Sequence, residues 1–214
     1  MKSKLFAFLF KNKLLIGINL LGFYLFAKMA EDVIDKEYIL VIDHWISMQI
    51  DTVHTPLFNV VMVALSDLYS VMGILLFSSV LMLFLAYKKW YTDLWFYFFC
   101  VMGAGTAFNA IKMIMQRLRP ESEILSITSY SFPSGHAMMA TAMAAAVYFI
   151  FVERVHSKSL HLLLSLFCIT WIGMIAFSRI YLDVHWLSDV IAGMGLGLFW
   201  VTFIVLVKRL IHTV

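Results

Sequence analysis

Residues 130–140 read YSFPSGHAMMA and stand where one strongly apolar run of the chain gives way to the next. The runs on either side, 92–114 and 136–153, each hold at most two charged residues. Of the 214 residues in the chain, 63% are hydrophobic and 14% are charged, whereas ordinary soluble domains have about 45–50% and about 25%. A chain with so few polar groups cannot cover a soluble surface, and we therefore predict an integral membrane protein.

The apolar runs are long enough to cross a membrane, because a hydrocarbon core about 30 Å thick needs roughly 20 apolar residues in a helix. They predict one all-α membrane domain, residues 1–214, with no repeat or linker. Cys100 and Cys168 lie inside apolar runs, so no disulfide framework is expected. The six predicted transmembrane helices span about 12–29, 69–87, 92–114, 136–153, 160–180 and 186–207.

The positions of Lys and Arg orient the spans, since basic residues concentrate in cytoplasmic loops. An even number of spans puts both termini on one side, and ten of the sixteen basic residues fall on that side. We therefore predict cytoplasmic termini and a retained first helix, because no small-residue cleavage site follows that helix. The ten residues are Lys2, Lys4, Lys11, Lys13, Lys88, Lys89, Arg154, Lys158, Lys208 and Arg209.

Residues 31–67 separate the first two spans on the extracytoplasmic side. Ile34, Tyr38, Val41 and Trp45 recur near helical spacing among polar residues. This pattern predicts an amphipathic helix in the membrane interface. We interpret it as a strap over the bundle rather than as a gate for substrate.

Three stretches hold polar groups that are costly inside a membrane. The first is KMIMQRLRP, residues 112–120, in which Lys112 lies within the third span. Arg119 follows seven residues later, which predicts one shared helix face and a separation of about 10 Å along the axis. Pro120 disfavours helix at Arg119, so the span should end there, at the outer surface. Taken alone, Lys112 could equally extend toward the lipid headgroups.

The second stretch is FPSGH, residues 132–136, at the start of the fourth span. Ser134 suits the cap of that helix, and Gly135 has no Cβ to block an approach. The first backbone N–H groups lack internal partners and, with the helix dipole, favour an anion such as phosphate. Taken alone, an ordinary capped helix with His136 at the interface is the simpler explanation.

The third stretch is SRIYLDVHWLSDV, residues 178–190, in which Arg179 ends the fifth span and His185 precedes the sixth. Asp189 follows His185 by four residues and can accept an imidazole N–H. The other ring nitrogen is then free as a base or a nucleophile. The alternative is a polar pair that faces a neighbouring helix.

The predicted topology brings four helix ends, and with them all three stretches, to one leaflet. Three cations and a helix N-terminus suit an anion with several oxygens, and two histidines suit a nucleophile and a general acid. With no metal-binding Cys/His spacing or carboxylate cage, the cations would replace a metal, and no cofactor is expected. We therefore predict that a histidine attacks a phosphate ester. The site residues are Lys112, Arg119, Ser134, Gly135, His136, Arg179, His185 and Asp189.

These stretches resemble the motifs of the type 2 phosphatidic acid phosphatase family, which is related to vanadium haloperoxidases. The family motifs K-x6-R-P, P-S-G-H and S-R-x5-H-x3-D match 112–120, 133–136 and 178–189. The resemblance implies that His185 forms a phosphohistidine, that Asp189 orients it and that His136 protonates the leaving oxygen. It also implies that the phosphoryl oxygens are held by Lys112, Arg119, Ser134, Gly135 and Arg179.

The resemblance further implies a metal-independent lipid phosphatase of the cytoplasmic (inner) membrane, with its site on the periplasmic or extracellular face. The expected partners are the bilayer and a lipid phosphate such as undecaprenyl diphosphate, phosphatidylglycerophosphate or phosphatidic acid; no nucleic acid is expected. A lipid A phosphatase or a lipid phosphotransferase would use the same motifs. A non-catalytic lipid-phosphate transporter would need the anion site but not His185 or Asp189. Gly193, Gly195 and Gly197 permit close helix packing within or between chains and leave the oligomeric state open.

Overall fold

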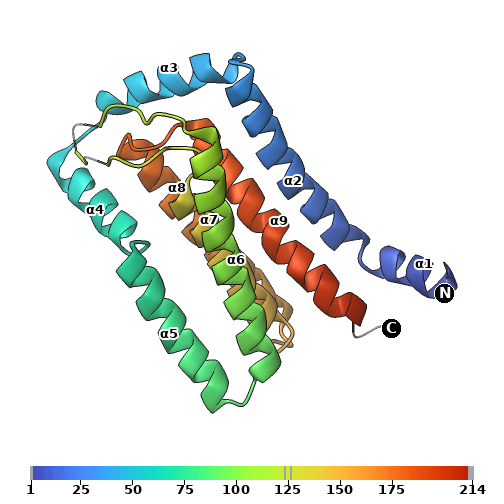
Figure 1. The fold of residues 1–214 in the computed structure, drawn as a ribbon. Coiled ribbons are helices and arrows are strands. Elements are labelled where there is room, and N and C mark those ends of the chain that lie inside the picture. The colour runs from blue at the N-terminus through green and yellow to red at the C-terminus, as the bar shows by residue number, and fades with distance from the viewer. Residues whose placement is uncertain (1, 123, 126, 212–214) are drawn as a thin grey trace.

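The computed structural model of the protein describes residues 2–122, 124–125 and 127–211, whose regular secondary structure is entirely α-helical. Figure 1 shows long helices side by side and one helix, α3, laid across one end of the bundle. Six helices coincide with the predicted spans: α2 (Lys13–Ile34), α5 (Val71–Tyr87), α6 (Tyr91–Met115), α7 (Gly135–Val152), α8 (Lys158–Tyr181) and α9 (Leu187–Ile211). The others in the described residues are α1 (Lys2–Lys11), α3 (Ile39–Asp51) and α4 (Pro56–Asp67).

Five helices of the described chain, α2 and α6 to α9, are long and apolar enough to cross a membrane. The sixth predicted span is less regular. α5 has 17 residues, which reach about 25 Å at a rise of about 1.5 Å per residue. It continues α4 after a bend of 53°, and the bent pair counted as one span makes six. The structure thus confirms an all-α membrane protein.

α7 is the central helix of the bundle and packs against α6, α8 and α9, while α2 lies along α9. Two glycines of α9, one helical turn apart, allow the closest approach. A Cβ added at Gly193 would lie 2.5 Å from the Ser134 carbonyl oxygen, and one at Gly197 would lie 2.7 Å from that of Met138. Gly195 faces α2 instead, where an added Cβ would lie 2.7 Å from the carbonyl oxygen of Gly22. The glycine pattern therefore serves packing within the chain.

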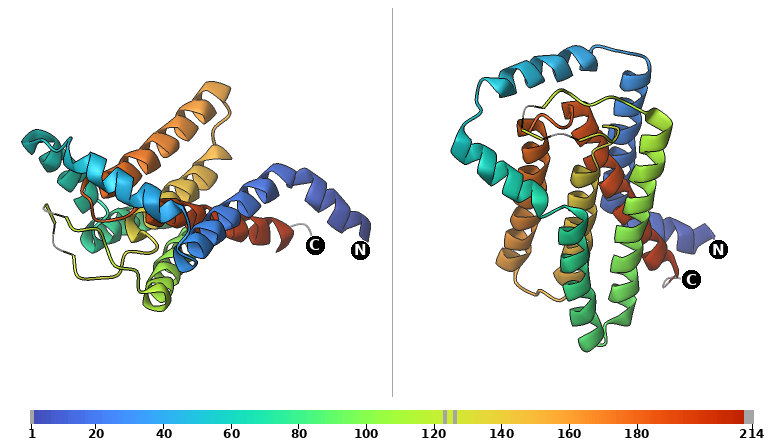
Figure 2. Two further views of the ribbon diagram at one scale, coloured as in Figure 1. Left: turned by 90° about the horizontal axis from the view of Figure 1, so that it is seen from above. Right: turned by 60° about the vertical axis from the view of Figure 1, so that its left-hand side comes forward.

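The predicted segment 31–67 begins with the last turn of α2 and then forms two helices, α3 and α4, rather than the single one predicted. α3 lies across the end of the bundle that is away from both termini, and α4 leads down into α5 (Figures 1 and 2). Hydrogen bonds attach this segment to the turn between α8 and α9. Ser47 Oγ donates to the Asp183 carboxylate at 2.9 Å, and His54 Nε2 lies 2.7 Å from the Tyr181 carbonyl oxygen. The segment is a strap, and it holds the turn that precedes α9.

Helix α1 is absent from the sequence-based prediction. It is separated from α2 by Asn12, whose buried side chain donates to the Phe8 carbonyl oxygen at 2.9 Å. Arg209 donates to Asn12 Oδ1 at 2.8 Å, which connects this break to the end of α9. The two termini therefore lie at the same end of the bundle (Figure 2).

Candidate active site

Helix α6 supplies Lys112 and ends at Met115, four residues before Arg119. The prediction that this span continues to Arg119 is wrong, because Gln116 adopts a left-handed conformation with φ 45° and turns the chain. Lys112 and Arg119 nevertheless meet, through a turn rather than along a helix face. Lys112 Nζ and Arg119 Nη2 donate to the same carbonyl oxygen, that of Tyr130, at 2.6 and 3.1 Å.

The Arg119 guanidinium connects the loop before α7 to the turn before α9. Its Nε donates to the Ser129 carbonyl oxygen at 2.7 Å, and its Nη2 donates to Ser129 Oγ at 3.0 Å. Its Nη1 donates to the Val184 carbonyl oxygen and lies 3.0 Å from His185 Nε2. A permanent positive charge thus stands beside one ring nitrogen of His185.

Arg179, on the last turn of α8, is only 1% exposed. Its Nη1 donates to Ser66 Oγ at the end of α4. Its Nε has no hydrogen-bond partner among the described residues. A buried cationic donor without a partner is costly, and a bound anion would remove that cost.

The start of α7 is built as the sequence predicts. Ser134 is the N-cap, and its Oγ accepts from the Ala137 N–H at 3.4 Å. The Ser134 N–H donates to the Asp189 carbonyl oxygen at 2.9 Å, which attaches the start of α7 to α9. A Cβ added at Gly135 would lie 2.9 Å from the ring of Phe108, so a larger residue there would require that ring to move.

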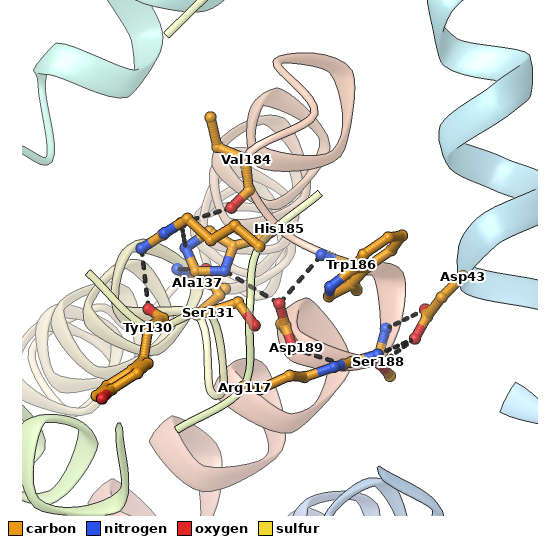
Figure 3. A network of polar contacts seen from close by, with 12 residues as sticks. Asp43, Arg117, Tyr130, Ser131, Ala137, Val184, His185, Trp186, Ser188 and Asp189 are labelled. Carbon is orange, nitrogen blue, oxygen red and sulfur yellow. Dashed lines mark hydrogen bonds and ion pairs between the residues drawn. The ribbon is translucent and has the colours of Figure 1, made fainter. Parts of the chain in front are cut away.

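His185 and Asp189 form the predicted pair at the start of α9. His185 Nδ1 lies 3.3 Å from Asp189 Oδ2, and the same oxygen accepts from the Trp186 N–H at 3.1 Å. Because α9 begins at Leu187, Asp189 is its third residue and caps the backbone just before the helix. Figure 3 shows His185 facing Asp189 in this arrangement. The imidazole is therefore held through Nδ1, and Nε2 is the nitrogen beside Arg119.

The electrostatic surroundings favour a neutral imidazole. His185 is 3% exposed. Burial holds the pKa of His185 well below its ordinary value of 6.5, and the positive charge of Arg119 lowers this pKa further. Burial also lowers the pKa of Arg119, while the charge of Asp189 opposes that shift. Neutral His185 keeps the lone pair that a nucleophile needs.

A cavity of about 330 Å³ joins these groups at the end of the bundle that α3 covers. Six of the eight predicted site residues line it: Lys112, Arg119, Gly135, His136, Arg179 and His185. Asp189 lies behind His185, as an orienting residue should. Ser134 is fully buried and caps its helix, so its contact with phosphate stays a prediction.

Several residues around the cavity were missed by sequence reasoning. Lys112, Arg117 and Arg119 are three cations within the eight residues 112–119, and this density of charge could have pointed to Arg117. Ser129 and the Tyr130 carbonyl lie in a loop without a recognisable pattern. Asp43 and Ser66 come from the strap, where polar residues are expected on any surface helix.

Fold and site together define a class, namely helical membrane proteins with a cationic cavity and a histidine–carboxylate pair at one end. The family model of the PAP2 superfamily matches residues 93–211, more than half of the chain. The chain belongs to the PAP2 superfamily, which confirms the resemblance seen in its three motifs.

Two curated relatives show how similar the sequence of this chain is to those of known proteins. Phosphatidylglycerophosphatase B of Bacillus subtilis (strain 168) is 30% identical over 105 residues, 46% of this chain and 50% of that protein. An undecaprenyl-diphosphatase of Sulfolobus acidocaldarius is 31% identical over 100 residues, 44% of each chain. The matched residues thus span half or less of the length of these relatives.

The similarity of fold covers more of the chain. The crystal structure of a transmembrane PAP2-type phosphatidylglycerolphosphate phosphatase from Bacillus subtilis superposes with a TM-score of 0.82. It covers 90% of this chain and 96% of its own, at 22% sequence identity.

Proposed function

We propose that the protein is a lipid phosphate phosphatase in which His185 is the nucleophile. The observation that carries this proposal is the convergence of Lys112, Arg119 and Arg179 on one cavity beside His185 Nε2. The unpartnered Nε of buried Arg179 supports an anionic ligand there. The names of the relatives, phosphatidylglycerophosphatase and undecaprenyl-diphosphatase, support phosphate as that anion.

In the proposed reaction, His185 Nε2 attacks phosphorus and the bond from phosphorus to the ester or anhydride oxygen breaks. His136, which lines the same cavity, gives the leaving oxygen its proton. Asp189 stabilises the positive charge on the phosphorylated imidazole through Nδ1–H. A water molecule then gives its proton to His136 and attacks phosphorus, which releases inorganic phosphate and restores His185. The cations stabilise the phosphoryl oxygens throughout.

A lipid as the phosphate carrier is supported by an apolar groove of about 590 Å³ between α5 and α6. The groove shares Val71, Ile74, Phe108 and Met139 with the cationic cavity. If the phosphate group of a lipid occupies the cavity, the acyl or prenyl chains of the same lipid would therefore lie in the groove. This placement also gives the substrate a lateral path from the bilayer.

The proposed location of the site is the extracytoplasmic face of the inner (cytoplasmic) membrane. The residues that line the cavity lie at the end of the bundle that α3 crosses, whereas both termini lie at the opposite end (Figure 1). The basic residues Lys88, Lys89, Lys208 and Arg209 are also at the end of the termini, which the positive-inside rule assigns to the cytoplasm.

The test measures phosphate release by the detergent-purified protein, with excess chelator present. The panel holds undecaprenyl diphosphate, phosphatidylglycerophosphate, phosphatidic acid and lipid A, each run beside His185→Ala. We expect chelator-resistant release that falls by at least about 10³-fold in His185→Ala, because removal of a nucleophile leaves only binding effects. His161→Ala, a histidine of α8 bonded to Val155, is the control that should keep activity.

Equal release by His185→Ala would contradict the proposed nucleophile. No release from any lipid would favour the transporter alternative, in which the cavity binds phosphate without cleavage. Transfer of phosphate to a second lipid, in place of release, would identify a phosphotransferase.

A further inference from the structure

Arg117 has none of the roles discussed so far, yet its guanidinium contacts Asp189, the carboxylate partner of His185. The left-handed turn at Gln116 directs the chain after α6 toward α9. Arg117 Nη1 then donates to Asp189 Oδ1 and to Ser188 Oγ, both at 2.7 Å. Its side chain is 11% exposed and lies against the ring of Trp186, with 5.5 Å from the guanidinium carbon to the ring centre.

Asp43 of the strap helix α3 contacts the opposite side of the same guanidinium. Arg117 Nη2 donates to Asp43 Oδ2 at 2.8 Å. Asp43 also accepts from the Ser188 N–H at 3.0 Å and from Ser188 Oγ at 2.5 Å. Its side chain is fully buried, and Figure 3 shows it on the side of Arg117 and Ser188 that is away from His185.

The two oxygens of Asp189 have separate partners, and this division explains what Arg117 does. Oδ2 contacts His185 Nδ1 and accepts a hydrogen bond from the Trp186 N–H, whereas Oδ1 accepts a hydrogen bond from Arg117. A carboxylate bonded at only one oxygen can rotate, but one bonded at both keeps its plane. Asp43 in turn holds the guanidinium, because one planar fork bridges both buried carboxylates.

We propose that Arg117 and Asp43 are positioning residues, which hold Asp189 so that His185 Nε2 faces the substrate phosphate. The strap helix is then a part of the active site, although it lies outside the residues that the family model matches. This inference rests on the proposed function, because it needs His185 as the nucleophile.

The experiment compares Arg117→Gln, Arg117→Lys and Asp43→Asn with the unchanged protein on the best substrate of the lipid panel. We expect kcat to fall about 10- to 100-fold in Arg117→Gln, by analogy with the loss seen when the orienting partner of a metal-bound histidine is removed. KM should change less than about twofold, because Arg117 does not line the cavity. Arg117→Lys should recover part of kcat, and Asp43→Asn should lose less than Arg117→Gln.

A double-mutant cycle with Asp189→Asn separates positioning from a general structural effect. If Arg117 acts through Asp189, adding Arg117→Gln to Asp189→Asn should cost less than about twofold in kcat. If the fall in kcat of the double variant equals the product of the falls in the two single variants, the inference is overturned. Arg154→Gln is the matched control, since Arg154 forms an ion pair with Asp93 far from the cavity and should keep kcat.

Two further outcomes are decisive. If His185→Ala is inactive but Arg117→Gln keeps a normal kcat, this inference is overturned and the proposed function stays in place. Full activity of His185→Ala would contradict both this inference and the proposed function. If Arg117→Gln does not fold, folded Arg117→Lys carries the test: a lowered kcat at unchanged KM supports positioning, and an unchanged kcat rejects it.

Discussion

His185 has a different environment at each of its two ring nitrogens, and this asymmetry sets its chemistry. Nδ1 meets the carboxylate of Asp189 at 3.3 Å, and Nε2 meets the guanidinium of Arg119 at 3.0 Å. The carboxylate stabilises a proton on Nδ1, whereas the cation opposes a proton on Nε2. The tautomer with its lone pair on Nε2 is therefore favoured, and phosphate would lie beside that nitrogen, among the cations that line the cavity.

The low pKa of His185 predicts how activity depends on pH. Because burial and Arg119 lower this pKa below 6.5, the imidazole stays neutral as the pH falls through 6.5. Loss of kcat/KM through protonation of His185 should therefore have its midpoint below pH 6.5. The measurement is the pH profile of kcat/KM with an aryl and an alkyl phosphate, whose own ionisations differ. A common midpoint at or above pH 6.5 would contradict the electrostatic argument.

The contact between α7 and α9 positions the end of α7 at which we propose that phosphate binds. Gly193 packs on the Ser134 carbonyl, directly before the Gly135 and His136 positions that line the cavity. The same two helices are joined by the hydrogen bond from the Ser134 N–H to the Asp189 carbonyl oxygen. Close packing thus sets the distance between the helix N-terminus and the His185–Asp189 pair.

This packing predicts the effect of one added methyl group. In Gly193→Ala the new Cβ would lie 2.5 Å from the Ser134 carbonyl oxygen, so backbone must move. We expect a loss of about 1–3 kcal/mol in stability and a fall in kcat, because the start of α7 shifts away from α9. Thermal unfolding and phosphate release measure the two effects.

Gly173→Ala in α8 is the matched control, since an added Cβ there meets nothing within 4 Å. It should keep both stability and kcat. A Gly193→Ala protein with unchanged melting temperature and activity would contradict the packing argument.

At the scale of the whole molecule, the two ends of the bundle differ in composition and in role. The end with the termini carries ion pairs such as Arg154 and Lys208 with Asp93. The opposite end carries the strap, the cavity and its buried cations. The strap is attached to this end of the bundle by hydrogen bonds of Asp43, Ser47 and His54, which fix it beside the site.

The proposed orientation is open to a direct labelling test. Cys100 and Cys168 are buried and can be replaced, after which single cysteines are introduced as Lys36→Cys or Lys88→Cys. Both lysines are exposed, Lys36 between α2 and α3 and Lys88 between α5 and α6. A membrane-impermeant maleimide should label only Lys36→Cys in intact spheroplasts, and both after lysis. Labelling of Lys88→Cys alone in intact cells would reverse the proposed topology.

The sequence by itself determined the membrane class, the approximate bounds of six helices and the three motifs that supply the site. These features follow from local composition and spacing: apolar runs of membrane length, a Ser–Gly cap before α7, and four residues between His185 and Asp189. The family and the polar residues of its three motifs could therefore be predicted from the sequence without coordinates.

Only the tertiary structure decided how Lys112 and Arg119 meet and which residues support Asp189. The turn at Gln116 depends on where α6 ends against its neighbours, and Pro120 alone placed that end too late. Asp43 lies 146 residues before Asp189, and its role exists only because α3 crosses the end of α9. Contacts between segments so distant in sequence follow from packing geometry, which no local pattern of residues encodes.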